Sequence, residues 1–186
     1  RNKRSKFYKI ELINFLLMCK ENNFDPSEIK GSYAGAMGQP QFISSSYRNF
    51  AIDFNNDKKV DLWDTNADVI GSVANYLKKN GWRRGQKIMT DLTFPESLRE
   101  MIITQSKKTY KPHTRYKVYL ENNIKSENLI NLEELLSIIR MKVRNKYIYK
   151  FGHKNFYVIT RYNRSRLYAL AVFHLAEELR ESKSSK

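Results

Sequence analysis

Oxygen-bearing side chains recur along one short segment at a spacing that suits a metal ion. Counted from its first residue, loop positions 1, 3, 5 and 9 are held by Asp53, Asn55, Asp57 and Asp61. This is the spacing of an EF-hand-like calcium loop, in which position 7 contributes a backbone carbonyl, here that of Lys59. The segment 53–64 therefore predicts a calcium-binding loop.

Two positions of this loop depart from the usual pattern. Position 6, where the sharp turn favours Gly, is Lys58, and position 12, where a bidentate Glu is usual, is Asp64. A left-handed conformation at Lys58 would cost about 1 kcal/mol. Asp68 on the following helix is a second candidate for the closing carboxylate. The alternative interpretation is a turn rich in Asp and Asn that caps the following helix.

A second segment, 31–42, combines small residues with amides and hydroxyls. Its Gly and Ala residues allow a close approach of one backbone to another. Its polar groups, on Ser32, Gln39 and Gln41, stand beside Tyr33 and Phe42. Such a surface suits a neutral, hydroxyl-rich ligand such as a sugar, which amides bind and aromatic faces stack against. The alternative is a glycine-lined helix crossing with incidental polar residues.

Helices must position most of these groups. Apolar residues at helical spacing predict the main helices over residues 6–22, 66–80, 129–140 and 165–180. Three consecutive serines, 44–46, are expected to cap a short helix that runs to Phe50. Runs rich in β-branched and aromatic residues predict strands over 146–151 and 156–160, with a short strand inside 87–94.

Composition bounds the class of protein. A chain of 186 residues with 41% hydrophobic content can bury a core, and its apolar runs are shorter than the roughly 20 residues of a membrane span. The formal charge of +15 implies attraction to a polyanion. Cys19 is the only cysteine, which rules out an internal disulfide and suits a packed apolar position. The three histidines lie far apart, so a zinc site has little support.

Long blocks of the sequence resemble the membrane-bound lytic murein transglycosylase B family. The resemblance is carried by GSYAGAMGQPQF, SSYRNFAIDFNNDKKVDLWD, ADVIGSVANYLKKNGWRRG and, near the C-terminus, FYVITRYNRSRLYALAVFHLAEEL. It covers about two thirds of the chain and is weak over 98–146. It implies an α+β, mainly helical, lysozyme-like fold with a small β-sheet and an EF-hand-like calcium loop. The final block resembles a closing strand and helix of the family.

The resemblance also implies a division of the chain. Residues 1–186 correspond to the C-terminal part of one catalytic domain. Within it we expect the EF-hand-like loop at 53–64, a smaller mixed α/β portion at 87–160 and a closing helix at 161–186.

The family that the chain resembles cleaves the β-1,4 bond between N-acetylmuramic acid and N-acetylglucosamine in peptidoglycan and leaves a 1,6-anhydro muramoyl end. A single glutamate first protonates the leaving oxygen and then takes the proton of the C6 hydroxyl of the sugar. By the resemblance, that glutamate would fall before Arg1. Glu11, Glu21 and Glu28 match positions outside this chemistry, and we interpret Glu11 as a structural partner.

The substrate groove of the family matches positions of this chain. The resemblance assigns substrate binding to Lys3, Arg4, Ser32, Gln41, Tyr76, Tyr162, Asn163 and Tyr168. It also includes the calcium loop, for which the spacing gives Asp53, Asn55, Asp57, Lys59, Asp61 and Asp68 as candidate ligands. Lys3 stands where relatives have Arg, so it lacks the bidentate fork of a guanidinium. For Tyr76 and Tyr168 the alternative is core packing.

These assignments set the expected partners and location. We expect peptidoglycan strands as the ligand, no nucleic acid, a monomer, and a periplasmic location with an outer-membrane lipid anchor upstream as a further option. A non-catalytic module that binds the cell wall through the same groove is the alternative function. A basic nucleic-acid binder is the third hypothesis, and no nucleic-acid motif supports it.

Overall fold

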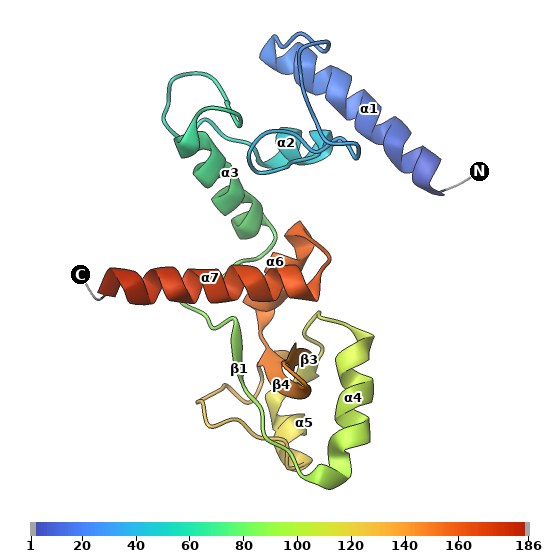
Figure 1. Cartoon of the computed structure of the whole chain (residues 1–186), viewed down its shortest axis with the longest axis vertical. Coiled ribbons are helices and arrows are strands. Elements are labelled where there is room, and N and C mark those ends of the chain that lie inside the picture. The colour runs from blue at the N-terminus through green and yellow to red at the C-terminus, as the bar shows by residue number, and fades with distance from the viewer. Residues whose placement is uncertain (1–2, 185–186) are drawn as a thin grey trace. The chain divides into compact units, whose positions relative to one another are not determined.

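The computed structural model describes residues 3–184, with side chains from Arg4 onward. The chain forms two compact units, Arg1–Lys79 and Asn80–Lys186, which are described separately (Figure 1). The first is helical, and the second contains the β-sheet.

The first unit contains three helices: α1 (Lys3–Asn22), α2 (Ser44–Phe50) and α3 (Asn66–Lys79). Its interior holds Met18 and Cys19 from α1, and burial raises the pKa of the Cys19 thiol. Cys19 therefore packs as a small apolar residue, as predicted. Other apolar side chains of α1 are exposed, including Leu12 and Ile13 at 59% and 58%.

Helix α2 is capped by a residue of another helix, and not by its own serines. The cap position is Ile43, which makes no side-chain cap hydrogen bond, and the three predicted capping serines lie inside the first turn. The backbone N–H of Ser45 instead donates to Oε2 of Glu11 at 3.0 Å. A carboxylate at a helix N-terminus satisfies a free N–H and complements the helix dipole. The structural role predicted for Glu11 is confirmed, and the capping role predicted for the serines is wrong.

The second unit is built on an antiparallel sheet of order β1-β4-β3-β2. Its strands are β1 (Met89–Asp91), β2 (Thr114–Arg115), β3 (Leu135–Val143) and β4 (Lys146–Gly152). The helical elements are η1 (Glu96–Leu98), α4 (Arg99–Lys108), α5 (Tyr116–Glu121), α6 (Lys154–Tyr162) and α7 (Arg166–Ser184). The end of α3 is followed by Gly81 at φ +93°, the glycine stop that the sequence predicts.

Neighbouring residues of β3 face opposite layers of this unit. Ile138 packs in a cluster with Ile102 of α4 and Phe151 of β4, whereas Ile139 packs with Phe156 of α6 and residues of α7. The sheet is thus buried on both faces between two sets of helices. At the edge of the second cluster, a Cβ on Gly152 would lie 2.7 Å from Ile139 Cγ1, so this position needs glycine.

Two predicted elements have the wrong type. Residues 129–140 were expected to be helical, but strand β3 begins at Leu135, and the preceding residues form a turn and connection. Because β3 is buried on both faces, its apolar run does not alternate, and its periodicity cannot distinguish a strand from a helix.

Residues 156–160 were expected to be a strand and belong to helix α6. The β-branched run of Val158, Ile159 and Thr160 favours a strand by propensity. Of the five residues 156–160, all but Tyr157 are buried, because α6 packs against the sheet and α7. Tertiary packing therefore overrides the local preference.

Asn155, on the first turn of α6, ties that helix to the segment that follows α3. It is fully buried, its Oδ1 accepts the N–H of Arg83 at 2.9 Å, and its Nδ2 donates to the carbonyls of Arg83 and Gln86 at 2.8 and 3.0 Å. These three bonds satisfy backbone groups that have no regular partner.

We expect Asn155→Ala to lower the free energy of unfolding by about 2–4 kcal/mol, because it leaves buried backbone groups without partners. The measurement is urea denaturation followed by circular dichroism. Asn122→Ala is the control, since Asn122 is exposed and its side chain donates to the carbonyl of Val118; the substitution should cost less than about 1 kcal/mol. Equal losses in both variants would contradict the role of Asn155.

Candidate functional site

The segment 31–42 folds as a tight double bend. Met37 makes β-bridges to both Gly31 and Phe42, and the side chains of Met37 and Phe42 are buried. Gly38 has φ +63°, and a Cβ there would lie 2.6 Å from the carbonyl oxygen of Leu62. The predicted close approach of backbones is thus present at Gly38, and its partner is the end of the acidic loop.

The amides of this segment are turned toward its own backbone and toward that loop. Gln39 Nε2 donates to the carbonyl of Trp63 at 2.7 Å. Gln41 has φ +53°, is exposed, and donates from Nε2 to the carbonyl of Gly38 at 3.0 Å. Gln39 is therefore structural, whereas Gln41 is an exposed residue whose hydrogen bond to Gly38 uses only its amide nitrogen.

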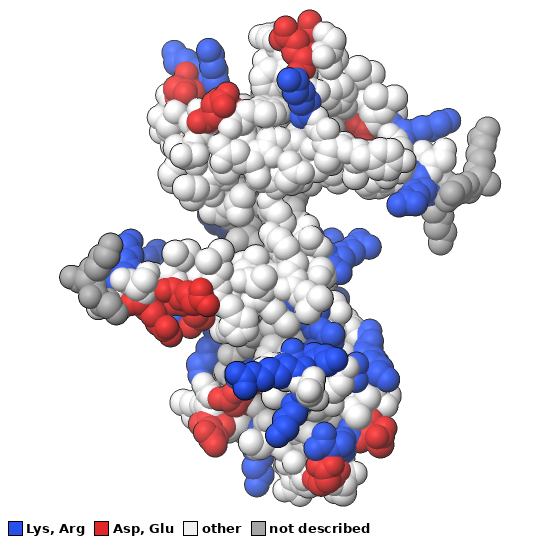
Figure 2. Space-filling view, in the orientation of Figure 1, with Lys and Arg blue, Asp and Glu red and all other residues white. Residues whose placement is uncertain are grey.

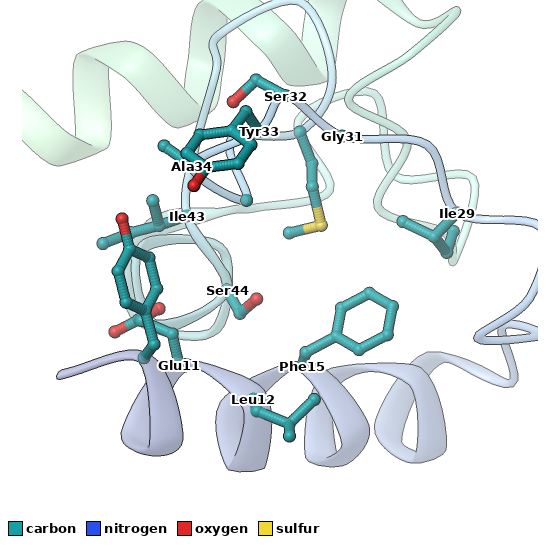
Figure 3. Close-up of a pocket in the computed structure, with 13 residues that line it drawn as sticks. Glu11, Leu12, Phe15, Ile29, Gly31, Ser32, Tyr33, Ala34, Ile43 and Ser44 are labelled. Atoms are coloured by element: carbon teal, nitrogen blue, oxygen red, sulfur yellow. The ribbon is translucent and has the colours of Figure 1, made fainter. Parts of the chain in front are cut away.

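A pocket of about 320 Å³ lies between α1 and this segment (Figure 3). Glu11 and Phe15 face it from α1, and Ser32, Tyr33 and Ser44 line the other side. It is a concave site with mixed apolar and polar walls, of the size that holds a small ligand.

Ser32 and Tyr33 are two of the exposed residues that line this pocket. Ser32 is exposed, and its Oγ accepts the N–H of Ala36 at 3.2 Å. Tyr33 has a fully exposed ring, which makes it available for stacking. Ser32 thus lines the pocket as a candidate ligand-binding residue, while Gln41 does not line it.

Tyr76 of α3 belongs to an aromatic cluster of the first unit. Its ring centroid lies 4.7 Å from that of Phe50 and 5.8 Å from that of the buried Phe42. The ring is half-buried, so packing and ligand contact are compatible at this position. Arg4 lies on the first turn of α1 and is exposed, and the side chain of Lys3 lies outside the described residues.

Three predicted site residues gather where α6 gives way to α7. The rings of Tyr162 and Tyr168 are stacked, with centroids 6.2 Å apart and an interplanar angle of 1°. Asn163 between them is exposed and forms the C-cap of α6. Ser165 Oγ accepts the N–H of Tyr168 at 3.2 Å, and burial raises the pKa of the Tyr168 phenol. An aromatic stack beside an exposed amide is a surface that suits a sugar ring.

The acidic loop brings three of its predicted ligands together. Oδ1 of Asp53 and Oδ1 of Asn55 both accept the N–H of Asp57, each at 3.2 Å. Asn55 Nδ2 donates to Asp57 Oδ2 at 2.9 Å, and the N–H of Lys58 donates to Asp53 Oδ2 at 2.8 Å. Lys58 itself has φ +73°, the left-handed conformation expected where the pattern usually has Gly.

The other two acidic residues are engaged elsewhere. Asp61 accepts the N–H groups of Trp63 and Asp64 and the hydroxyl of Thr65. Burial raises the pKa of the Asp61 carboxyl, but these hydrogen bonds outweigh it and hold that pKa below its usual value. The three donors precede α3, which begins at Asn66, so Asp61 holds the turn ahead of that helix.

Asp68 is fully buried, and its two oxygens accept the N–H groups of Phe54 and Asp61 at 2.8 and 2.9 Å. It closes the loop through hydrogen bonds from the backbone. Across residues 3–184 no three His, Cys, Asp or Glu side chains converge as a metal site. The loop thus offers two carboxylates and an amide, Asp53, Asp57 and Asn55, as the nucleus of a cation site.

Sequence reasoning named Asp68 as a closing carboxylate for calcium but did not find that it accepts two backbone N–H groups. It also did not locate the excess of positive charge within the chain. Residues 1–79 contain 12 Lys and Arg and 9 Asp and Glu, whereas residues 80–186 contain 22 and 10. A count of charge by segment would have located the excess of +12 in the second unit.

Comparison with known proteins places the chain in a family. Residues 1–177 match the family model described as the transglycosylase SLT domain. The chain is 36% identical over 180 residues to membrane-bound lytic murein transglycosylase B of Escherichia coli strain K12, with 94% of this chain and 46% of that protein covered.

Solved structures show the same fold. Catenated lytic transglycosylase SltB1 from Pseudomonas aeruginosa has a TM-score of 0.89 at 35% identity, covering 96% of this chain and 58% of that chain. The Escherichia coli lytic transglycosylase Slt35, in complex with calcium, has a TM-score of 0.82 at 34% identity, covering 98% and 56%. SltB3 from Pseudomonas aeruginosa, in complex with NAG-anhNAM-pentapeptide, has a TM-score of 0.74 at 29% identity, covering 92% and 46%.

These comparisons confirm the predicted α+β, mainly helical, lysozyme-like transglycosylase fold. The chain spans about half the length of the relatives it matches. None of the helices described within residues 3–184 is long and apolar enough to cross a membrane. The match over residues 1–177 covers nearly the whole chain, including the segment 31–42 and the acidic loop. The chain therefore belongs to the transglycosylase SLT domain family.

Proposed function

We propose that this chain is the saccharide-binding part of a peptidoglycan lytic transglycosylase, which cleaves the bond between N-acetylmuramic acid and N-acetylglucosamine and forms 1,6-anhydro ends. The family match over residues 1–177 carries the proposal. The stacked Tyr162 and Tyr168, the exposed Asn163 and the pocket beside Ser32 support it, because they pair aromatic faces with amides and hydroxyls.

The reaction needs one carboxylic acid that holds its proton near neutral pH until it donates it to the leaving oxygen. In this chain the carboxylate at the pocket of Figure 3 is Glu11. Its Oε2 is already bound to the N–H of Ser45, so its role is to cap α2. We therefore place the catalytic acid outside residues 1–186, while both units contribute to one partial catalytic domain.

The same proposal sets the partners and location. The ligand is the glycan strand of peptidoglycan, and the site of action is the periplasm, in keeping with a relative whose name describes it as membrane-bound. Attachment by an upstream lipid and a monomeric state belong to the proposal as well. A module that binds the wall without cutting it is the competing function, and an activity assay on a longer protein that carries the catalytic acid separates the two.

The chain by itself should bind peptidoglycan and release no 1,6-anhydro muropeptides above background, since a missing general acid costs about 10²- to 10⁴-fold in rate. The measurement is mass spectrometry of the soluble products. Glu11→Gln is the matched variant, because Gln keeps an oxygen that can accept the N–H of Ser45. Release of anhydro products by the chain, lost in Glu11→Gln, would show that Glu11 is the acid.

Gln41→Ala should weaken binding of a chitin-type tetrasaccharide about fivefold to tenfold, because the amide oxygen of this exposed residue is a hydrogen-bond acceptor for the sugar. The free energy of unfolding should fall by only about 0.5–1 kcal/mol, through the lost bond to Gly38. Titration calorimetry measures the binding, and Gln86→Ala is the control at another exposed Gln. Lost stability with unchanged binding would mean that Gln41 is structural.

We also propose that the acidic loop binds calcium as a structural ion. Asp53, Asn55 and Asp57 would supply side-chain oxygens and Lys59 a carbonyl, with Asp61 and Asp68 holding the loop ends. Two observations support this proposal: the left-handed Lys58 at loop position 6 and the calcium complex of the relative Slt35.

Calcium should raise the melting temperature of the chain. An ion that binds only the folded form stabilises it by about 2.7 kcal/mol at a free concentration 100 times its Kd, and magnesium should do much less. Differential scanning calorimetry in calcium and in chelator gives the shift. Asp57→Asn should reduce it, whereas Glu127→Gln removes the same charge at an exposed position and should not. An unchanged melting curve would rule out the site.

A further inference from the structure

Basic side chains are concentrated on the unit that contains the sheet. Residues 80–186 carry 22 of the 34 Lys and Arg with 10 acidic residues, a net +12 out of the total of +15. Figure 2 shows Lys and Arg side chains spread over this unit, with separate patches of Asp and Glu among them. The attraction for an anion therefore belongs mainly to the second unit.

Within this unit, one pocket gathers four cations. It has a volume of about 360 Å³ and lies between the C-terminal ends of α4 and α6. Lys107 and Lys108 come from α4, Arg161 from the last turn of α6, and Arg164 from the segment that follows. No Asp or Glu is among the described residues that line it.

The ends of the two helices account for only part of this charge. A helix C-terminus carries about −0.5 elementary charge, which attracts Lys and Arg to the last turn. Two such ends offset about one positive charge, whereas Lys107, Lys108 and Arg164 alone supply three. Among residues 3–184, Lys107, Lys108 and Arg164 form no salt bridge. The pocket is thus positively charged beyond what the fold itself requires.

Its size and walls favour a compact anionic group. Tyr110 and Tyr157 flank the cations, and the buried Thr160 turns its hydroxyl away, to the carbonyl of Tyr157 at 2.7 Å. A volume of about 360 Å³ admits one or two amino-acid side chains, and the groove that a nucleic-acid duplex needs is far larger. Guanidinium and ammonium groups around such a space suit carboxylates.

The position of the pocket relates it to the sugar-binding candidates of the same unit. Arg161 and Arg164 immediately flank Tyr162 and Asn163 along the chain. Resting on the proposed function, we infer that this pocket binds the carboxylates of the peptide carried by the muramoyl sugar, while Tyr162 and Asn163 contact the glycan. The second unit would then bind two parts of one substrate, the neutral sugar and its anionic peptide.

The test compares binding of three probes to the full 186-residue chain by titration calorimetry at low salt. The probes are a disaccharide with its pentapeptide, the same compound with its carboxylates converted to amides, and the disaccharide without peptide, with its lactyl carboxyl also converted to an amide. Lys107→Gln/Lys108→Gln is the pocket variant. Lys142→Gln/Lys146→Gln is the matched control, since both lysines are exposed on strands β3 and β4. All four lysines are exposed, so both variants should fold.

We expect the pocket variant to bind the peptide-bearing disaccharide about fivefold to tenfold more weakly, and the control to stay within about twofold. Arg164→Gln should act in the same direction. The amidated probe should bind the unmodified chain as weakly as the acidic probe binds the pocket variant. The disaccharide without peptide should bind all proteins alike.

Other outcomes would overturn the inference. Equal losses in pocket variant and control would mean that charge acts only at long range. If the disaccharide binds but its peptide adds no affinity, the inference fails and the proposed function stands. If no saccharide binds, both fail. Tighter binding of inorganic phosphate or of a short oligonucleotide, lost in the pocket variant, would assign the pocket to a phosphate-bearing ligand instead.

Discussion

The first unit depends on one buried carboxylate. Asp68 of α3 is completely inaccessible to solvent, and it remains satisfied because its two oxygens accept the N–H groups of Phe54 and Asp61. A buried charge without such partners would cost several kcal/mol. The two bonds fix both ends of the acidic loop on the helix. The loop in turn presents the carbonyls of Leu62 and Trp63 to the backbone and side chain of Gln39, so the bend that carries Ser32 and Gln41 is built on the same carboxylate.

The second unit uses buried polar groups in the same way at the junction of sheet and helix. Asn155 fixes the start of α6, and next to it the buried His153 bonds through Nδ1 to Glu134 at 2.8 Å and through Nε2 to Thr90 at 3.0 Å. These bonds join β1, the approach to β3 and the end of β4. The start of α6 is thereby set, and with it the positions of Arg161, Tyr162 and Asn163 eight residues or fewer further along the helix. Hydrogen bonds between buried polar groups thus fix the positions of the exposed polar side chains at the end of α6.

The proposed function separates two kinds of recognition in this chain. Aromatic faces, amides and hydroxyls, such as those of Tyr162, Tyr168 and Ser32, would contact uncharged sugar hydroxyls at short range. The net +12 of the second unit acts at longer range and draws an anionic polymer to the surface, with a strength that falls as salt rises. A glycan that carries acidic peptides would make both the short-range contacts and the long-range attraction. The proposed substrate therefore accounts for the family membership and for the positive charge of the chain together.

The sequence alone determined the features that are encoded locally. Helices α1, α3 and α7, strand β4, the glycine stop at Gly81 and the left-handed position at Lys58 follow from periodicity, turn residues and motif spacing. The family and its fold followed from long blocks of matching residues. Tertiary structure decided the type of β3, because burial on both faces removes the alternation that marks a strand. It decided the type of α6 as well, because packing against the sheet and α7 overrides the strand propensity of its β-branched run. It also decided that Glu11 caps α2 across 34 residues, and that Lys107 and Lys108 meet Arg164 in one pocket. Such partners lie far apart along the chain, and only the packing of the helices that carry them brings them together.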